Sequence, residues 1–244
     1  MRQDAKALEL RERALSAVRS EPRIGPRFKP VALKIEADGT ATIQAEVDNI
    51  AVKRLALERL AATKGISAIV DRLRVKPAKP MSDDGILDHL RKAYFAEPAF
   101  AALKIKERKG GKLKRVQDAP DPRGEIEIDV KKGVVILNGR VPGLASKRLA
   151  GVLAWWVPGS RDVVNGIAVE PPEEDAPIRI EEAVRIALDK DPFVDASQVR
   201  AGVRNRTVRL TGAVRSREAR DAAEWDAWYV FGVDDVINEL EVMP

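Results

Sequence analysis

Residues 207–214 read Thr-Val-Arg-Leu-Thr-Gly-Ala-Val, and two other stretches of the chain follow the same pattern. They are residues 134–141, Val-Val-Ile-Leu-Asn-Gly-Arg-Val, and residues 40–47, Thr-Ala-Thr-Ile-Gln-Ala-Glu-Val. Apolar residues alternate with polar or small ones in each stretch, which is typical of a strand with one buried face. A pattern that recurs three times predicts a chain built from three copies of one small unit.

Two further landmarks recur in each copy. The sixth residue of each stretch lies 20 residues before a glycine, namely Gly65, Gly159 or Gly232. Upstream, an acidic residue precedes a proline in each copy, as Glu21-Pro22, Glu97-Pro98 and Asp191-Pro192. Proline cannot continue a helix, so each pair marks the end of a first helix. We expect the three glycines to be C′ caps of a second helix.

Each copy is predicted to run helix, strand, strand, helix, strand. The hairpin turns fall at residues 37–40, 131–133 and 205–206, where glycine or asparagine tolerates positive φ. The second helices are expected over residues 50–63, 145–157 and 216–230, and the last strands over 68–75, 162–169 and 234–242. The predicted fold class is α+β: three tandem αββαβ modules, each a small sheet with two helices packed on one face.

Proline-rich linkers set the expected module boundaries. The linkers are residues 76–80 and 171–177. The first module then spans residues 1–78, the second 79–171 and the third 175–244. The second module carries an insertion at residues 104–123. Each module is small enough to be only marginally stable alone, so contacts between modules should add stability.

This pattern resembles the BON domain, a bacterial module named for osmotic-stress and nodulation proteins. The resemblance rests on residues 191–192, 208–214, 232–233 and 236–242 in the third copy, and on 133–141, 158–159 and 163–169 in the second. The first copy departs from the pattern because Ala45 stands where the others have glycine. The resemblance implies an αββαβ module without catalytic activity that binds phospholipid or envelope components.

Composition narrows the function classes. The chain has 244 residues, a net charge of +5, no cysteine and a single histidine. Disulfides, thiolate metal sites and a cysteine nucleophile are therefore excluded, and a histidine-rich metal site is not expected. Since no spaced acid–base pair stands out, we expect no enzymatic activity, no cofactor and no small-molecule substrate. The N-terminal residues contain no apolar signal core, so we expect a cytoplasmic location, with peripheral contact at a membrane.

The insertion in the second module is strongly basic. Seven of the twelve residues in 104–115 are basic and one is acidic. The basic residues, the candidate anion-binding set, are Lys104, Lys106, Arg108, Lys109, Lys112, Lys114 and Arg115. A basic loop of this kind can bind anionic phospholipid, to which each Lys or Arg contributes about 1 kcal/mol, or nucleic-acid phosphates. It can equally be a solvated hairpin extension without a ligand.

Aromatic residues gather in the second helices of the second and third modules. They are Trp155, Trp156, Trp225, Trp228 and Tyr229. In the third module an alanine face is expected to meet the sheet, which leaves these rings for other contacts. The candidates are a neighbouring module, a second copy of the chain, a protein partner or a membrane interface.

Charges on the outer sheet faces suggest one more contact. Residues 1–78 and 79–171 carry net charges of +6 and +5, whereas residues 172–244 carry −6. Alternation nevertheless places Arg200, Arg204 and Arg209 on the outer face of the third sheet, and Glu125, Glu127 and Asp129 on that of the second. One hypothesis is that these two faces approach each other; the alternative is that both are solvated.

The sequence favours a non-enzymatic binding protein that associates peripherally with anionic phospholipid or an envelope component, in osmotic or envelope stress. The alternative is a scaffold that self-associates or docks a protein partner through the tryptophan helices. Non-specific nucleic-acid binding is the third hypothesis.

Overall fold

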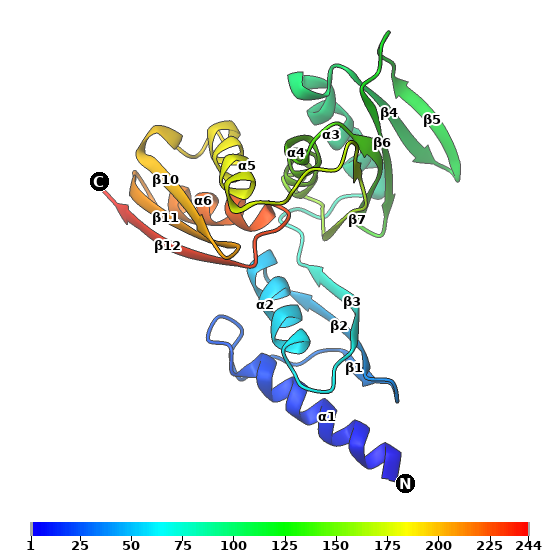
Figure 1. The fold of residues 1–244 in the computed structure, drawn as a ribbon, viewed down its shortest axis with the longest axis vertical. Helices are drawn as coiled ribbons and strands as arrows, with labels where there is room; N and C mark the ends of the chain where they lie inside the picture. Colours follow the sequence, from blue (N-terminus) through cyan, green and yellow to red (C-terminus); the bar gives the residue numbers. More distant parts are fainter. Residues whose placement is uncertain (1, 244) are drawn as a thin grey trace. The chain divides into compact units, whose positions relative to one another are not determined.

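The computed structural model describes residues 2–243, with side chains from residue 6 onward. Within that range the chain forms six α-helices and twelve strands, arranged in three small mixed sheets (Figure 1). The chain divides into two compact units, Met1–Lys76 and Pro77–Pro244. The first unit holds one sheet and the second unit holds the other two.

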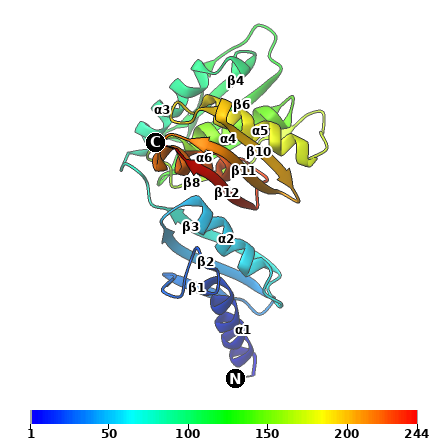
Figure 2. The same ribbon diagram turned by 90° about the vertical axis from the view of Figure 1, so that its left-hand side faces the viewer.

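The first module consists of one three-stranded sheet and two helices. Its elements are α1 (Arg2–Arg19), β1 (Ala32–Ile35), β2 (Thr40–Val47), α2 (Ile50–Ala61) and β3 (Ala68–Val75). The central strand β2 pairs antiparallel with β1 and parallel with β3, because α2 carries the chain across the sheet. Both helices pack on one sheet face, where Ile43, Leu60 and Leu73 are fully buried (Figure 2).

The second module repeats this arrangement with additional strands. Its elements are α3 (Asp83–Ala96), β4 (Leu103–Lys109), β5 (Lys112–Gln117), β6 (Gly124–Lys131), β7 (Val134–Val141), α4 (Leu144–Trp155), β8 (Asp162–Asn165) and β9 (Ala168–Val169). The strand order is β5-β4-β6-β7-β8, and β9 also pairs with β7. The strand triplet β6, β7 and β8 has the pairing of the first sheet, antiparallel and then parallel.

The third module returns to the simple form. Its elements are α5 (Pro177–Lys190), β10 (Val199–Arg204), β11 (Thr207–Val214), α6 (Arg217–Tyr229) and β12 (Asp235–Val242). Strand β11 pairs antiparallel with β10 and parallel with β12. The predicted fold class, three tandem αββαβ modules with two helices on one face of each sheet, is confirmed.

The hairpin turns contain the backbone conformations that the sequence predicts. Lys132 and Gly133 have φ of 53° and 76°, and Asn205 and Arg206 have φ of 50° and 63°. Two consecutive positive φ values are those of a type I′ turn, whose twist matches that of the flanking strands. These turns set the register of β6 against β7 and of β10 against β11.

The expectation that glycines cap the second helices is wrong. Helix α2 ends at Ala61 with Ala62 as its C-cap, and α6 ends at Tyr229 with Val230 as its C-cap. Gly65 and Gly232 come later, in the turn that leads to the last strand. Gly65 and Gly232 have φ of 104° and 100°, a conformation that side chains rarely adopt, and a Cβ at Gly65 would lie 3.2 Å from the Leu10 side chain of α1. A Cβ at Gly159, the third of these glycines, would lie 2.9 Å from the Ile86 side chain of α3. In the first two modules the glycines therefore allow this turn to approach the first helix.

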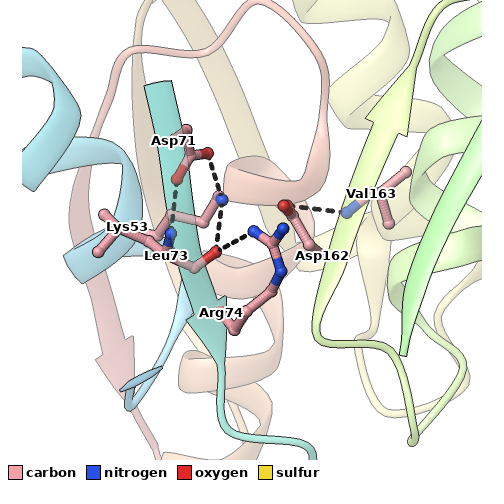
Figure 3. A network of polar contacts seen from close by, with 6 residues as sticks. All are labelled: Lys53, Asp71, Leu73, Arg74, Asp162 and Val163. Atoms are coloured by element: carbon pink, nitrogen blue, oxygen red, sulfur yellow. Dashed lines mark hydrogen bonds and ion pairs between the residues drawn. The ribbon is translucent and has the colours of Figure 1, made fainter. Parts of the chain in front are cut away.

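A network of hydrogen bonds, which we call the bracket, joins the second helix to the third strand in the first module (Figure 3). The buried Lys53 of α2 donates from Nζ to Asp71 Oδ2 at 2.5 Å and to the Leu73 carbonyl oxygen at 3.0 Å. Asp71 Oδ1 accepts from the Leu73 amide at 2.8 Å, and Arg74 also donates to the Leu73 carbonyl oxygen. These hydrogen bonds replace those that the Lys53 ammonium group makes with water in the unfolded chain, and they offset the cost of burying its charge.

Counterparts of this bracket occur in the other two modules. Asn165 and Asn238 take the place of Asp71, and each accepts from the amide two residues further on, at 3.3 and 3.2 Å. Each also donates from Nδ2 to a carbonyl oxygen of the second helix, that of Lys147 at 2.7 Å or Arg220 at 3.0 Å. This recurring Asx position was missed in the sequence, because a lone Asp or Asn in a strand carries no periodic signal.

We expect Asn165→Ala to destabilise the second module by about 1–2 kcal/mol. The substitution removes a donor to the Lys147 carbonyl oxygen and an acceptor for the Ile167 amide, and half-buried polar groups that lose their partners are costly. Chemical denaturation at neutral pH measures the change. Asn138→Ala, at an exposed position on neighbouring β7, is the matched control and should leave stability nearly unchanged. Equal stability of the two variants would contradict the role of the bracket.

Candidate functional site

The basic insertion is part of the sheet. Of the alternatives that the sequence left open, the hairpin extension is the one found, because β4 and β5 form a hairpin whose turn is Gly110-Gly111. Strand β4 pairs in parallel with β6, with Ile105 opposite Ile126. Leu103 and Ile105 are buried in the core beneath α3, so alternate residues of the insertion are core residues. The insertion thus extends the sheet by two strands beyond β6 (Figure 1).

Part of the basic set is compensated on the outer face of this sheet. Lys106 Nζ lies 2.9 Å from Glu125 Oε2 and 3.6 Å from Glu127 Oε1, and the hydrogen bond with Glu125 raises the pKa of Lys106. Arg108 Nε lies 3.9 Å from Asp129 Oδ2. The acidic outer face of β6 therefore neutralises the basic residues of β4 directly beside it.

Three lysines project together near the hairpin turn, and we call Lys109, Lys112 and Lys114 the hairpin lysine cluster. Lys109 lies opposite Lys112 across the hairpin, and Lys114 lies opposite Glu107. Glu107 precedes Lys109 by two residues and points to the same side of β4, so all three lysines lie on one side of the hairpin. They are exposed. Lys109 lies 3.3 Å from Asp84 Oδ1, whereas Lys112 and Lys114 form no ion pair with any of the described residues.

The other predicted members of the basic set are arranged differently. Arg115 is exposed on the opposite side of the hairpin and lies 2.6 Å from Asp118. Lys104 is half-buried on β4 and is unpaired among residues 2–243. The exposed Leu113 lies opposite Arg108, on the same side of the hairpin as Arg115. The hairpin lysine cluster therefore lies on one side of the hairpin, and Leu113 lies on the other.

The hypothesis that the outer faces of the second and third sheets approach each other is wrong. Helices α4, α5 and α6 lie between the two sheets and pack against one another (Figure 1). The carboxylates of β6 pair within their own sheet, as described above. Arg209 pairs with Glu239 of β12, while Arg200 and Arg204 are exposed. The buried faces of both sheets point inward, so the charged faces point away from each other.

The aromatic residues of α4 and α6 form the contact between the second and third modules. The rings of Trp155 and Tyr229 stack with centroids 5.6 Å apart and planes 11° apart. Trp156 donates from Nε1 to Asp226 Oδ1 at 2.9 Å. Trp228 is fully buried, and Trp225 is half-buried. Of the predicted uses for these rings, packing between modules is the one that the structure supports.

Charged side chains complete this contact. Arg148 of α4 is fully buried; its Nε donates to the Phe231 carbonyl oxygen at 2.9 Å and its Nη2 pairs with Asp175. Lys190 at the end of α5 lies 2.9 Å from the buried Glu97 of the second module. The sequence analysis marked Glu97 only as the residue before a proline, and it did not single out Arg148, because an arginine in a helix is ordinarily exposed.

Asp226 is a buried acid at the centre of the same contact. Its side chain is 1% exposed, and burial, together with the neighbouring Asp191 carboxylate, raises its pKa to about 8. Burial also raises the pKa of Tyr229 to about 12. At neutral pH the Asp226 carboxyl group is therefore protonated in the folded protein, and its Oδ1 accepts from Trp156.

Trp155 and Trp228 are buried, and Trp156 and Tyr229 are half-buried in the contact between the modules. Trp228 is fully buried because α6 packs against α4 and α5 as well as against its own sheet. The hypothesis that these helices dock a partner stays a prediction. Separately, no helix within residues 2–243 is long and apolar enough to cross a membrane.

Comparison with known proteins agrees with this architecture. A family model described as the BON domain matches the chain twice, at residues 110–171 and 179–244. The matches fall in the second and third modules. A comparison with curated proteins finds no match.

Two solved structures are similar to the chain. One is described as the C-terminal domain of CdsD, the structural protein of the type III secretion system of Chlamydia trachomatis. It is 14% identical, with 97% of this chain and 98% of that chain covered, and the TM-score is 0.25. A second CdsD structure is 13% identical, with coverages of 97% and 93% and a TM-score of 0.25.

Proposed function

The chain belongs to the BON domain family, and on that premise we propose that it is a non-catalytic binding protein that associates with an anionic phospholipid surface. The observation that carries the proposal is the hairpin lysine cluster, which is exposed and lies beyond the acidic residues of β6. The first module shares the element order and strand pairing of the other two, so the proposal treats it as a third, divergent BON module.

The expected attraction is modest. Each lysine near an anionic leaflet contributes about 1 kcal/mol, so the cluster contributes about 3 kcal/mol, or roughly a hundredfold in partitioning. This is less than the basic composition of the insertion alone implies, because β6 already neutralises Lys106 and Arg108. Binding should therefore be peripheral, reversible and sensitive to salt. The proposal includes a cytoplasmic location, where anionic lipids give the membrane surface its negative potential, and a role in osmotic or envelope stress.

We expect the double variant Lys112→Gln/Lys114→Gln to bind anionic vesicles roughly 30-fold more weakly than the unmodified protein, because two contributions of about 1 kcal/mol are lost. Flotation with phosphatidylcholine vesicles, with and without phosphatidylglycerol, measures this at low and moderate salt. Lys64→Gln/Lys92→Gln is the matched control, since it makes the same change in net charge at two exposed lysines elsewhere.

Equal flotation of both double variants would show that overall charge, and not the hairpin lysine cluster, governs binding. Absence of flotation for the unmodified protein at low salt would contradict the lipid proposal. Binding of the same variants to duplex DNA tests nucleic acid, the other source of phosphate groups. Binding of DNA without binding of vesicles would assign the cluster to nucleic acid, with a steep dependence on salt concentration.

A further inference from the structure

Strand β10 is an open edge of the third sheet, whereas its counterpart in the second module is covered. In the second module β4 runs parallel to β6 and pairs with its outer edge over Leu103–Glu107. In the third module the strand order is β10-β11-β12, and no described strand pairs with the outer edge of β10 (Figure 2). The second module therefore displays, within one chain, how a strand can be added to this edge of a BON module.

The two edges can be compared residue by residue. Ile126 of β6 lies opposite Gly139, and Val199 of β10 lies opposite Gly212. Ile126 and Val199 are thus equivalent, and Arg200 occupies the position of Glu127. Glu127 is one of the two carboxylates that contact Lys106 of the added strand β4. The charge at this edge position is consequently reversed in the third module.

A groove lies where the added strand would bury its apolar side chains. It has a volume of about 890 Å³ and is lined by residues of α5 and β10, including Ile186, Val199 and Ala201. In the second module the corresponding space between α3 and β6 is filled by Leu103 and Ile105, which are 2% and 0% exposed. Strand β10 thus has an open backbone edge beside a groove whose lining combines apolar residues with Glu182, Asp189, Arg185 and Arg200.

An arginine on α5 provides a second point of comparison. In the second module Arg91 of α3 donates from Nε to Glu107 of β4 at 2.6 Å. The acid–proline pairs at the ends of α3 and α5 make Arg185 the equivalent of Arg91. Arg185 lines the groove and is exposed. Neither Arg185 nor Arg200 forms an ion pair with the residues that the structure describes.

We propose that β10 binds an extended acidic segment of another protein, which adds to the sheet as a strand parallel to β10. In the register of β4, its third residue is apolar, lies opposite Val199 and fills the groove as Ile105 does. Its first residue is also apolar and lies beside Ser197, in the 3-10 helix Ala196–Gln198 that precedes β10. Its fourth residue is acidic and faces Arg200, and its fifth is acidic and faces Arg185. Backbone hydrogen bonds supply affinity in this mode of binding, and alternate side chains supply specificity.

The class of partner follows from Arg185 and Arg200, whose equivalents in the second module face the added strand; Glu182 and Asp189 also line the groove, and Glu182 already pairs with Arg179. The two arginines flank the edge from opposite faces of the sheet, so a basic or neutral strand would leave both without a counter-ion. An exposed and unpaired edge is also one that proteins ordinarily protect by pairing or covering it. A partner strand with acidic residues at two adjacent positions satisfies both arginines and the edge together.

A labelled peptide tests the proposal with the full chain. Its sequence is Leu-Thr-Ile-Glu-Glu-Thr-Thr, and fluorescence anisotropy measures binding. We expect saturable binding that becomes at least about tenfold weaker in Arg200→Glu and in Arg185→Glu, because like charges then face each other. Arg27→Glu, at an exposed arginine of the first module, makes the same change in net charge and should bind as the unmodified protein does. Circular dichroism confirms that each variant is folded.

Two further peptides separate strand addition from simple charge attraction. Each is N-methylated at alternate residues, one on each backbone edge, so that only one of them can still pair with β10. Strand addition predicts that one methylated peptide binds and the other does not. Equal binding by both, or equal binding by a scrambled peptide of the same composition, would overturn the proposal.

Sedimentation of the chain alone tests for a second copy as the occupant. Strand β12 carries Glu239 and Glu241 on its outer face, so it is the acidic strand that another copy would offer. Self-association that increases with concentration, is abolished by Arg200→Glu and prevents peptide binding would assign the edge to a second copy and overturn the heterologous partner. A monomer that binds the peptide supports the proposal.

Discussion

Gly139→Ala should destabilise the second module by about 2–5 kcal/mol. Gly139 has φ of 110°, a conformation that side chains rarely adopt, and a Cβ there would clash with the Glu125 carbonyl oxygen on β6. A residue forced into such a conformation costs about 1–3 kcal/mol, and overpacking against the neighbouring strand costs a similar amount. Thermal unfolding followed by circular dichroism should show a lower unfolding temperature, by roughly 10 °C for a unit of this size.

The first module supplies the control for this prediction. Ala45 takes the corresponding position on β2, and it does not have a positive φ. Strand β1 begins at Ala32, opposite Gln44, so no β1 residue pairs with Ala45. Ala45→Gly should therefore cost less than about 1 kcal/mol, the ordinary penalty of glycine in a strand. An unchanged unfolding temperature in Gly139→Ala would show that the backbone at residue 139 relaxes around a Cβ.

Asp226→Asn should stabilise the protein at pH 8 and remove much of its dependence on pH. In the folded protein Asp226 keeps its proton up to about pH 8, whereas an exposed carboxyl group loses it near 3.8. Between these values the folded state binds more protons than the unfolded state, so the free energy of unfolding falls as pH rises. The slope is about 1.4 kcal/mol per pH unit, which sets a ceiling of about 6 kcal/mol over the window.

Asparagine fits the Asp226 site without the proton. Its Oδ1 can accept from Trp156 Nε1, and its Nδ2 can donate to the Asp191 carboxylate, which lies beside Asp226. Urea denaturation at about pH 4.5, 6 and 8 measures the difference in the free energy of unfolding between the unmodified protein and Asp226→Asn. These pH values sample the range in which Asp226 is protonated only in the folded protein. Asp221→Asn, at an exposed position of α6, should keep the pH dependence of the unmodified protein. Identical pH dependence in Asp226→Asn would contradict a protonated Asp226.

Local signals accounted for most of the fold. The alternating stretches, the acid–proline pairs and the turn residues Asn205 and Gly133 each act over a few residues, so they could be recognised directly. The resemblance of the second and third modules to the BON domain matched the family model as well. The predicted ends of the second helices were less accurate. The glycines that follow these helices allow a turn to approach a first helix, which lies far away in the sequence.

The sites depended on contacts that periodicity does not encode. Lys106 and Arg108 read as free cations in a basic run, but the parallel pairing of β4 with β6 sets them beside carboxylates. The contacts of Trp155 and Trp156 depend on which faces of α4 and α6 meet between the second and third modules. Asp226 could not be recognised in the sequence, because an aspartate in an amphipathic helix is ordinarily solvated. Its burial between helices is what raises its pKa.

The packing of α4 against α5 and α6 has a further consequence for how the second unit can act. Since the helices face inward, the two sheets present their outer surfaces in opposite directions. The hairpin lysine cluster and the edge of β10 belong to different sheets. If both proposed ligands bind, the unit would act as an adaptor: attachment at one site would raise the local concentration of whatever the other site holds, and two weak contacts would act together as a durable bridge.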